Sequence, residues 1–471
     1  MLLTESKSLN YAVDGRGRTS LLESLQAQGF VPLIRSARLH LYETALAGAE
    51  LSGAGQARDL ESALAGRAEA EMEAPYVRGE LFCMEDCAHF LLFGEEAGEG
   101  TRAGIVYESG TGDAPEKLDA FCRAVRESLE ASRGVGGIGS PAGVPAELEW
   151  ENRASRVSDS FRRFAAEASA TPTGTRGEMV DGWLRSSGML EDSQARGFLR
   201  RLSEAHREGR AATRAAGDES VPDALLNRLA EVGLLKREIL VSCRKDGRSL
   251  FRLPSPDAFS VLSGSNATCN ECGAAIADER AEEVTVPTSL TATLLQDGAW
   301  LSTHLRSLIS KLGIPDAQIA ARSTGADGEV RLMANVCGEA FLFLLHDGDW
   351  TTAQARRALD EHAKIESTYL VLVATGKIQE DARARLREHA RRRAQGGRAL
   401  EVILIEGMDA LAAELQLVFE RVSADALAEE LWELDTSLGV SAGQLVATRF
   451  RLMRRQGAQS VMAASAVASM S

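Results

Sequence analysis

Two cysteines near the middle of the chain have the spacing of a metal-binding knuckle. Cys269 and Cys272 are separated by two residues, and Gly273 follows the second one. A turn of this kind points two thiolates at one ion, which suits tetrahedral zinc. A complete site needs two further ligands, and only Cys243, Cys337 or a distant histidine is available to supply them. The pair predicts a structural zinc site, with a ribbon-like turn that holds no metal as the alternative.

A second cysteine pair, Cys83 and Cys87, lies beside a short apolar run. Free cysteine is among the most buried residue types, so we expect two buried thiols here rather than metal ligands. The chain holds seven cysteines, and an odd number without a signal-peptide core favours the reducing cytoplasm. No apolar run approaches the roughly 18 residues of a spanning helix, so no membrane contact is expected.

Basic residues are expected on a β-hairpin just before the knuckle. Residues 222–232 have leucines at helical spacing, with a glycine suited to end the helix. Two apolar strands, 238–243 and 249–253, then flank an Asp-Gly dipeptide, which favours a hairpin turn. The turn between these strands carries three cations, Arg244, Lys245 and Arg248.

This order of helix, glycine, strand and basic-tipped hairpin resembles the end of a winged helix. In that family the wing tip contacts the DNA backbone, which implies that Arg244, Lys245 and Arg248 lie near phosphates. Winged helices also serve as protein-interaction modules, and charged residues are ordinary at a hairpin tip. Duplex DNA and a protein are therefore both open as partners of this segment.

A second basic stretch covers residues 377–398, which contain eight Lys or Arg residues and three acidic residues. Arg383, Arg387 and Arg391 are spaced four residues apart, so they share one face of a helix. No aromatic residues are interleaved, and single-strand stacking is therefore not indicated. The face suits the phosphates of a duplex, and a solvated arginine-rich helix is the alternative.

The elements that precede this basic stretch read strand, strand, helix and strand, at 329–336, 340–345, 352–364 and 369–374. An amphipathic helix comes before them and another helix and strand follow. This order resembles the core of the PD-(D/E)xK, restriction-endonuclease-like nucleases over about residues 290–422, which is less than a third of the chain.

The residues at the catalytic positions of that family differ in this sequence. The nucleases place an acidic residue on the second strand and an (Asp/Glu)-x-Lys on the third, which hold and use Mg²⁺. The matching positions here are Arg331, Leu344 and His346. Arginine and leucine cannot ligate Mg²⁺, so the resemblance implies a fold without catalytic residues. A displaced metal site made by Glu329, His346 and Asp347 is the alternative.

The sequence as a whole predicts a multidomain α/β protein. Strands in the first domain are expected at 30–34, 39–42, 81–83, 90–93 and 103–107. The helical extension is expected to pack on the core or on a second subunit. The expected segments are an acidic α/β domain at 1–133, a Gly/Pro/Ser linker at 134–147, a helical segment at 148–216, a winged-helix-like segment with the knuckle at 217–282, a pseudo-nuclease α/β domain at 283–422, the helical extension at 423–455 and a flexible tail at 456–471.

Charge limits the functions that fit this chain. The net charge is −15, so nucleic acid binding needs a local basic face. The first 133 residues hold 22 acidic and 13 basic residues, and phosphate contact is not expected there. Three functions stay open: a non-catalytic, DNA-associated scaffold or regulatory protein of bacterial genome maintenance or phage defence, a metal-dependent nuclease with a displaced site, or an interaction protein that assembles with protein partners or as a homo-oligomer without nucleic acid.

Overall fold

The computed structural model of the chain shows a mixed α/β protein, about 54% helical and 24% strand. The chain forms two compact units. Unit 1 is formed by Met1–Val157, Val336–Gly338 and Leu415–Ser471, and unit 2 by Ser158–Asn335 and Glu339–Glu414. The structure describes residues 1–47, 54–71, 76–94, 100–134, 148–153, 156–170, 181–208, 222–265, 267–295, 298–323, 329–396, 400–438 and 441–468.

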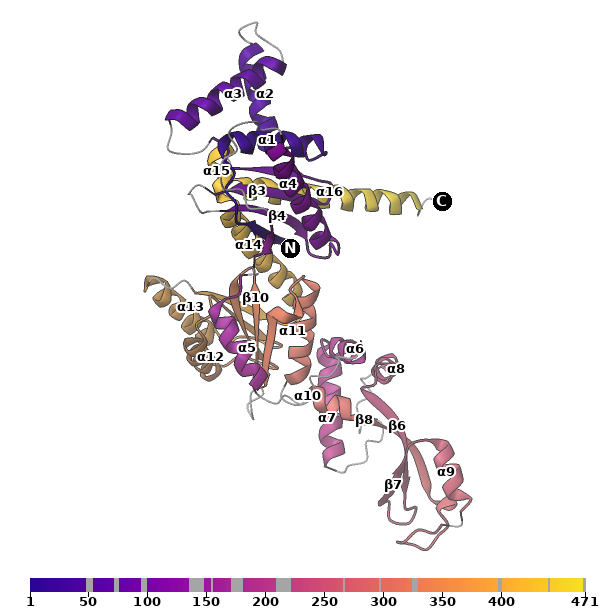
Figure 1. The fold of residues 1–471 in the computed structure, drawn as a ribbon. Helices are drawn as coiled ribbons and strands as arrows, with labels where there is room; N and C mark the ends of the chain where they lie inside the picture. Colours follow the sequence, from indigo (N-terminus) through magenta and orange to yellow (C-terminus); the bar gives the residue numbers. More distant parts are fainter. Residues whose placement is uncertain are drawn as a thin grey trace. The chain divides into compact units, whose positions relative to one another are not determined.

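Unit 1 is built on a five-stranded sheet with the strand order β2-β3-β4-β1-β5. Two of these strands, β3 and β4, are labelled in Figure 1. Each paired neighbour runs antiparallel. Gly104 of β4 is opposite Phe90 of β3, and a Cβ at Gly104 would lie 2.1 Å from the Phe90 ring. The glycine is therefore required for this close packing. The strands are β1 (Leu2–Leu9), β2 (Gly79–Cys83), β3 (Cys87–Phe93), β4 (Thr101–Glu108) and β5 (Trp150–Asn152).

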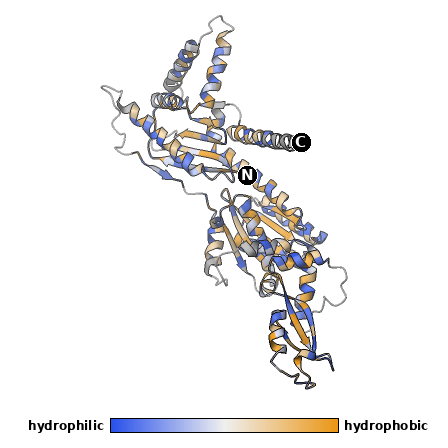
Figure 2. Ribbon diagram, turned by 90° about the vertical axis from the view of Figure 1, so that its right-hand side faces the viewer, coloured by the Kyte–Doolittle hydropathy of each residue, from blue (hydrophilic) through white to orange (hydrophobic). Residues whose placement is uncertain are grey.

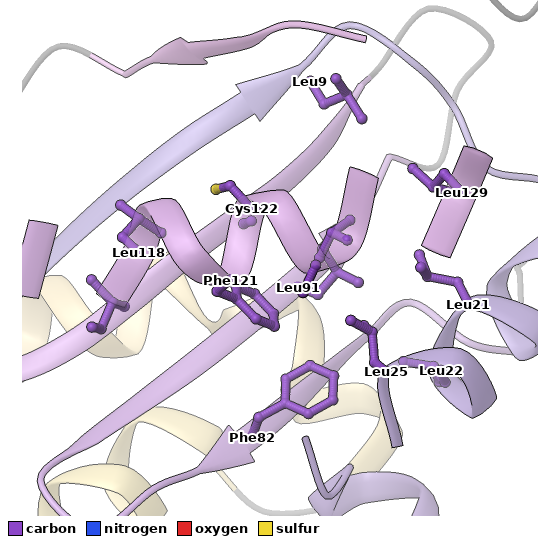
Figure 3. Packing of buried hydrophobic residues seen from close by; sticks show 14 of the residues in the cluster. Leu9, Leu21, Leu22, Leu25, Phe82, Leu91, Leu118, Phe121, Cys122 and Leu129 are labelled. Carbon is purple, nitrogen blue, oxygen red and sulfur yellow. The ribbon is translucent and has the colours of Figure 1, made fainter. Parts of the chain in front are cut away.

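One apolar cluster of unit 1 joins this sheet to α1 (Gly15–Ala27) and α4 (Ala114–Gly134). Phe121 of α4 and Phe82 of β2 are both fully buried, and their ring centroids are 5.4 Å apart (Figure 3). Cys122 lies in the same cluster. The strands expected at 81–83, 90–93 and 103–107 lie within β2, β3 and β4.

A second apolar cluster of unit 1 contains residues from both ends of the chain. Side chains of β2, β3 and β4 pack with Leu427 of α14 (Leu411–Glu430) and with Leu431, which directly follows this helix. Leu434 of α15 (Trp432–Leu438) belongs to the same cluster. Phe450 of α16 (Ala442–Ala468) completes the cluster. The helical extension expected at 423–455 therefore packs on the sheet of the first domain.

The strands expected at 30–34 and 39–42 are wrong, because α2 (Leu33–Ala47) covers 39–42 and begins within 30–34, where Pro32 forms only an isolated β-bridge to Phe82. The cause is a partner distant in sequence. The buried carboxylate of Glu80 accepts the backbone N–H groups of Ile34 at 2.6 Å and Arg35 at 3.0 Å, and so satisfies the first turn of the helix. Helix α3 (Ala54–Glu71) follows, and Arg35 pairs with its Glu61 at 3.2 Å.

The expected linker at 134–147 lies outside the described residues, apart from Gly134, which ends α4. The tail expected at 456–471 continues α16 as far as Ala468. Its alanine-rich sequence has a high helix propensity, which accounts for the continuation.

Unit 2 contains a second five-stranded sheet, with the strand order β13-β12-β11-β10-β9. β9 and β10 are antiparallel, whereas β11, β12 and β13 are parallel. Figure 2 shows hydrophobic residues along many of the strands and a mixture along the helices. The strands are β9 (Ile319–Ser323), β10 (Glu329–Val336), β11 (Glu339–His346), β12 (Tyr369–Ala374) and β13 (Glu401–Glu406).

Helices connect the parallel strands of this sheet, as parallel pairing requires. α12 (Thr352–Ile365) lies between β11 and β12, and α13 (Glu380–Gln395) lies between β12 and β13. Thr351 and Gln354 form a reciprocal capping box that starts α12. The other helices that bear on this sheet or precede it are α5 (Asp159–Ala170), α10 (Ser289–Leu295) and α11 (Ala299–Lys311).

A three-stranded antiparallel sheet, in the order β7-β6-β8, forms the remaining part of unit 2. The expected hairpin corresponds to β6 (Leu235–Ser242) and β7 (Ser249–Leu253), and β8 (Arg280–Pro287) was not expected. The helices of this region are α6 (Asp181–Met189), α7 (Ser193–Arg207), α8 (Asp223–Glu231) and α9 (Pro256–Ser263). Among the residues described, no helix is long and apolar enough to cross a membrane.

Candidate metal centre

Four side chains in the β6–β8 region of unit 2 converge on one point. Cys243 follows β6, Cys269 and Cys272 lie in the loop after α9, and Glu279 lies just before β8. Their candidate ligand atoms, three sulfurs and a carboxylate oxygen, all lie within 4.8 Å of one another. Within the described ranges this is the group of side chains that could hold a metal ion.

The loop that carries two of the cysteines is folded by its own backbone. Gly273 N–H donates to Cys269 O at 2.8 Å, and Cys269 N–H donates to Ala274 O at 2.7 Å. Gly273 has a φ of +76°, which a residue with a side chain rarely adopts. This tight turn brings the thiols of Cys269 and Cys272 to the same side.

Glu279 is bound from two directions. The Cys272 thiol donates to Glu279 Oε1 at 2.9 Å, and the backbone N–H of Arg244 donates to Glu279 Oε2. The hydrogen bond to Glu279 raises the pKa of the Cys272 thiol to about 12. The same bond, together with the one from Arg244, lowers the pKa of Glu279. The carboxylate is thus ionised and fixed beside three sulfurs.

The donor set indicates which ion suits this cluster. Thiolates are soft ligands, and three of them with one carboxylate favour zinc over magnesium or calcium. With a Zn–S bond of about 2.3 Å, the sulfurs of a tetrahedral site lie about 3.8 Å apart, so the cluster needs only a small contraction. Binding would require the thiols to lose their protons. The residues therefore fit a closed, four-ligand site.

The sequence pointed to three of these four residues. It predicted Cys269 and Cys272 and named Cys243 as one candidate for completion, whereas Cys337 lies in unit 1 and outside the cluster. Glu279 was missed. A glutamate seven positions after the second cysteine belongs to no common zinc spacing, and it reaches the site only because Ile276–Asp278 form a short 3-10 turn.

The basic residues predicted for DNA contact fall on two elements. Arg244, Lys245 and Arg248 are exposed on the turn between β6 and β7. On α13, Arg387 and Arg391 are exposed too. The third predicted residue of α13, Arg383, is less available, because its guanidinium pairs with Glu406 at 2.5 Å and with Glu380 at 3.8 Å.

The positions aligned with the nuclease carboxylates have other roles in the structure. Arg331 of β10 pairs with Glu361 of α12 at 2.6 Å. Leu344 of β11 is buried in the sheet. The ring of His346 contacts the Gln354 side-chain amide nitrogen at 2.9 Å, and burial lowers the pKa of the histidine.

Asp347, proposed above as part of a displaced metal site, has partners for both carboxylate oxygens. Trp300 Nε1–H and the Thr375 hydroxyl each donate to it at 2.8 Å. Arg200 pairs with the same carboxylate, and Arg196 Nε lies 3.7 Å from it.

These contacts surround the carboxylate of Asp347 with hydrogen-bond donors. The side chain of Glu329 lies outside the described residues, so the structure does not test its role in a displaced metal site with Asp347.

No family model, curated protein or solved structure matches this chain.

Proposed function

We propose that the chain is a non-catalytic protein that associates with duplex DNA, as in bacterial genome maintenance or phage defence. We further propose that the cluster in unit 2 holds a structural zinc ion. The observation that carries the proposal is the hairpin tip, defined as Arg244–Arg248. It presents three exposed cations on a tight turn in an otherwise acidic protein. Such a local cationic surface is what phosphate binding requires when the net charge is negative.

The absence of catalysis in this proposal is supported by the side chains of the α/β core. A nuclease of the resembled kind needs carboxylates that are free to hold Mg²⁺. Arg331 and Leu344 occupy the aligned positions, and Arg331 is already paired with Glu361. The nearby carboxylate of Asp347 is paired with Arg200 and hydrogen-bonded by Trp300. The consecutive order of β9 to β13 supports a nuclease-like scaffold in which these positions have become structural.

The second proposed DNA contact is the exposed side of α13. Arg387 and Arg391 are one helical turn apart and both are exposed. Arg383 lies on the same line, but its pairing with Glu406 reduces what it can offer to a phosphate. Two phosphate contacts from α13 and up to three from the hairpin tip are therefore expected, since Arg248 also pairs with Asp246 at 3.7 Å and with Glu271 at 3.5 Å.

The proposal predicts duplex binding that weakens steeply with salt. The measurement is fluorescence anisotropy of the full chain with a short labelled duplex at several salt concentrations. Reversing Arg387→Glu and Arg391→Glu together should reduce the slope of log affinity against log salt by about 1.8, since each phosphate contact contributes about 0.9. The matched control reverses Arg162 and Arg163, two exposed arginines on α5, and should leave the slope unchanged.

The same samples separate this proposal from a displaced nuclease. Adding Mg²⁺ or Mn²⁺ should leave the duplex intact. Metal-dependent cutting that disappears in Asp347→Ala would overturn the non-catalytic proposal. An unchanged salt slope in the α13 double variant would remove that helix from the DNA contact and leave the hairpin tip alone.

An interaction protein without nucleic acid is the second candidate. It is favoured by large apolar side chains exposed on the helices of unit 1: Leu417 of α14, Trp432 of α15 and Leu452 of α16 are each more than half exposed. Exposed side chains of this size are typical of protein contacts when they lie together. Absence of duplex binding at low salt, with a stable complex or self-association lost in Trp432→Ala, would support this candidate.

A further inference from the structure

The hairpin tip is attached to the candidate metal centre through its own first hydrogen bonds. Cys243 immediately precedes Arg244. Its backbone N–H donates to Arg248 O at 2.8 Å, and its carbonyl accepts the N–H of Gly247 at 2.8 Å. Both ends of the tip are therefore held by Cys243, whose thiol belongs to the metal cluster.

Two further contacts join the tip to the other ligands of the cluster. Glu279 accepts the Cys272 thiol with one oxygen and the backbone N–H of Arg244 with the other. In addition, Arg248 Nη1 lies 3.5 Å from a carboxylate oxygen of Glu271, which is placed between the two knuckle cysteines. Each of these contacts therefore connects the tip either to a residue of the cluster, Cys243 or Glu279, or to Glu271, the residue next to Cys272.

Hydrophobic burial contributes little to holding this end of the region. Among the described residues, the apolar cluster around the site has four buried members, Val241, Cys243, Cys269 and Ile276, and the eight other hydrophobic side chains packed against them are only partly buried. The tip residues themselves are exposed. A core this small cannot order a polar turn alone, and small domains commonly depend on a metal for that reason. The order of the tip therefore depends on how firmly the four ligands are held together.

We propose that metal occupancy of the Cys243, Cys269, Cys272 and Glu279 cluster orders the hairpin tip and thereby sets its affinity for duplex DNA. Both statements rest on the zinc site proposed above, and the statement about affinity rests on the proposed DNA association as well. Binding of one Zn²⁺ displaces three thiol protons, so that three thiolates and one carboxylate surround the ion and the centre carries a net charge of −2. The ion thus joins four side chains that are otherwise connected through hydrogen bonds and apolar packing.

The change in charge and the change in order act on DNA affinity in opposite directions. Without the ion, the cluster holds three neutral thiols and one carboxylate, so that metal binding adds one negative charge near the tip. Three of the four ligands are buried, so this charge lies behind the tip and not among its exposed cationic side chains. Loss of order frees the backbone of all five tip residues. Phosphate binding must then fix this backbone again, at a cost in conformational entropy. The effect of order is therefore the larger one, and metal removal is expected to weaken DNA binding.

The coupling between metal and tip is tested without DNA by limited trypsin digestion of the full chain. The chain is loaded with Zn²⁺ or stripped with a chelator, and the fragments are identified by mass spectrometry. Metal removal should speed cleavage after Arg244, Lys245 and Arg248 at least about tenfold. The reason is that local unfolding of the turn, which gives the protease access, then costs less free energy. Cleavage after Arg387 and Arg391 on α13 is the internal control and should not change. Equal tip cleavage with and without Zn²⁺ would overturn the proposal.

The effect on DNA is tested by a two-by-two comparison of duplex binding. The wild-type chain and the variant R244E/K245E/R248E are each measured with and without Zn²⁺. Metal removal should lower the salt slope of the wild type by up to about 2.7, since up to three contacts of about 0.9 each are lost. It should leave the variant, which retains α13, unchanged. An equal loss in both proteins would contradict control through the tip.

The two tests also distinguish the inference from the function on which it rests. Metal-dependent cleavage at the tip, with no duplex binding by any sample, would show that the coupling exists and that the proposed function fails. Duplex binding by the wild type that is the same with and without Zn²⁺ would show that the function stands and the inference fails.

Discussion

The carboxylate of Glu279 joins two parts of the chain that sequence spacing does not connect. One oxygen accepts the thiol of Cys272, and the other accepts the backbone N–H of Arg244. Carboxylate oxygens are zinc ligands, with bonds of about 2.0–2.2 Å. The oxygen that accepts the Cys272 thiol can therefore bind the ion instead. The other oxygen can keep its bond to Arg244. A single side chain is thereby placed to offer an oxygen to an ion and to support the neighbouring turn.

Substitution of Cys272 tests this ligand set directly. We expect Cys272→Ser to weaken zinc binding at least about 10–100-fold, since even the loss of an outer-shell partner costs that much. The measurement is competition for zinc with a chromophoric chelator, followed by metal analysis of the purified protein. Cys83→Ser, which changes a half-buried cysteine of unit 1, is the matched control and should bind zinc normally. Equal zinc binding by the two variants would exclude Cys272 as a ligand.

The predictability of the site differs from residue to residue. Cys269 and Cys272 could be found because their short spacing is typical of a metal-binding knuckle. Cys243 could be named only as one candidate among several, since its approach depends on the pairing of β6 with β8. Glu279 gave no signal, because glutamate is common on surfaces and its role arises from the short turn before β8.

At the scale of elements, local patterns were sufficient where a segment is mostly apolar and bounded by turns. The strands predicted at 329–336 and 369–374 have the same bounds as β10 and β12. β8 and β1 were missed because both are rich in polar and charged residues, and they are strands through their pairing with β6 and β4. α2 was misread as strand because the carboxylate that satisfies its first turn comes from β2, 46 residues away from Ile34.

The junction of β2 and α2 has a pH dependence that can be measured. Burial raises the pKa of Glu80 to about 7, against the hydrogen bonds from Leu81, Ile34 and Arg35 and the charge of Arg38. The raised value means that the folded state favours the protonated carboxyl. Its contribution to stability is therefore complete below the ordinary pKa of about 4.5 and declines as the pH rises to about 7.

We therefore expect α2 to be less stable at pH 8 than at pH 5, by up to about 3 kcal/mol from this group. In Glu80→Gln this part of the pH dependence should disappear, since an amide does not titrate; its single oxygen can still accept the N–H groups of Ile34 and Leu81, whereas the bond from Arg35 is lost. Hydrogen exchange of the α2 amides at the two pH values measures the difference for this element. Titration of the other groups, such as His89, is common to both proteins and cancels in the comparison. An identical pH dependence in the two proteins would contradict the assignment to Glu80.

At the scale of the whole molecule, unit 1 is assembled from the two ends of the chain. Residues of α14, α15 and α16 share one apolar cluster with β2, β3 and β4, although more than 300 residues separate them in sequence. The sequence could indicate that 423–455 is helical and amphipathic, but not which surface it covers. That choice depends on the shape of both apolar faces, and periodicity describes only one face at a time.

This assembly makes the stability of unit 1 dependent on its C-terminal helix. Phe450 of α16 is 2% exposed in the shared cluster, whereas Leu452, two residues further on, is 53% exposed. We expect Phe450→Ala to destabilise unit 1 by about 3–5 kcal/mol, because a large buried ring leaves a cavity when it is removed. Leu452→Ala should stay within about 0.5 kcal/mol of the wild type, as is usual for exposed positions. Hydrogen exchange of β2, β3 and β4 reports the effect, because it follows the N-terminal sheet rather than the substituted helix. A loss of protection confined to α16, with the sheet unaffected, would show that the N-terminal part of unit 1 is stable without the C-terminal helices.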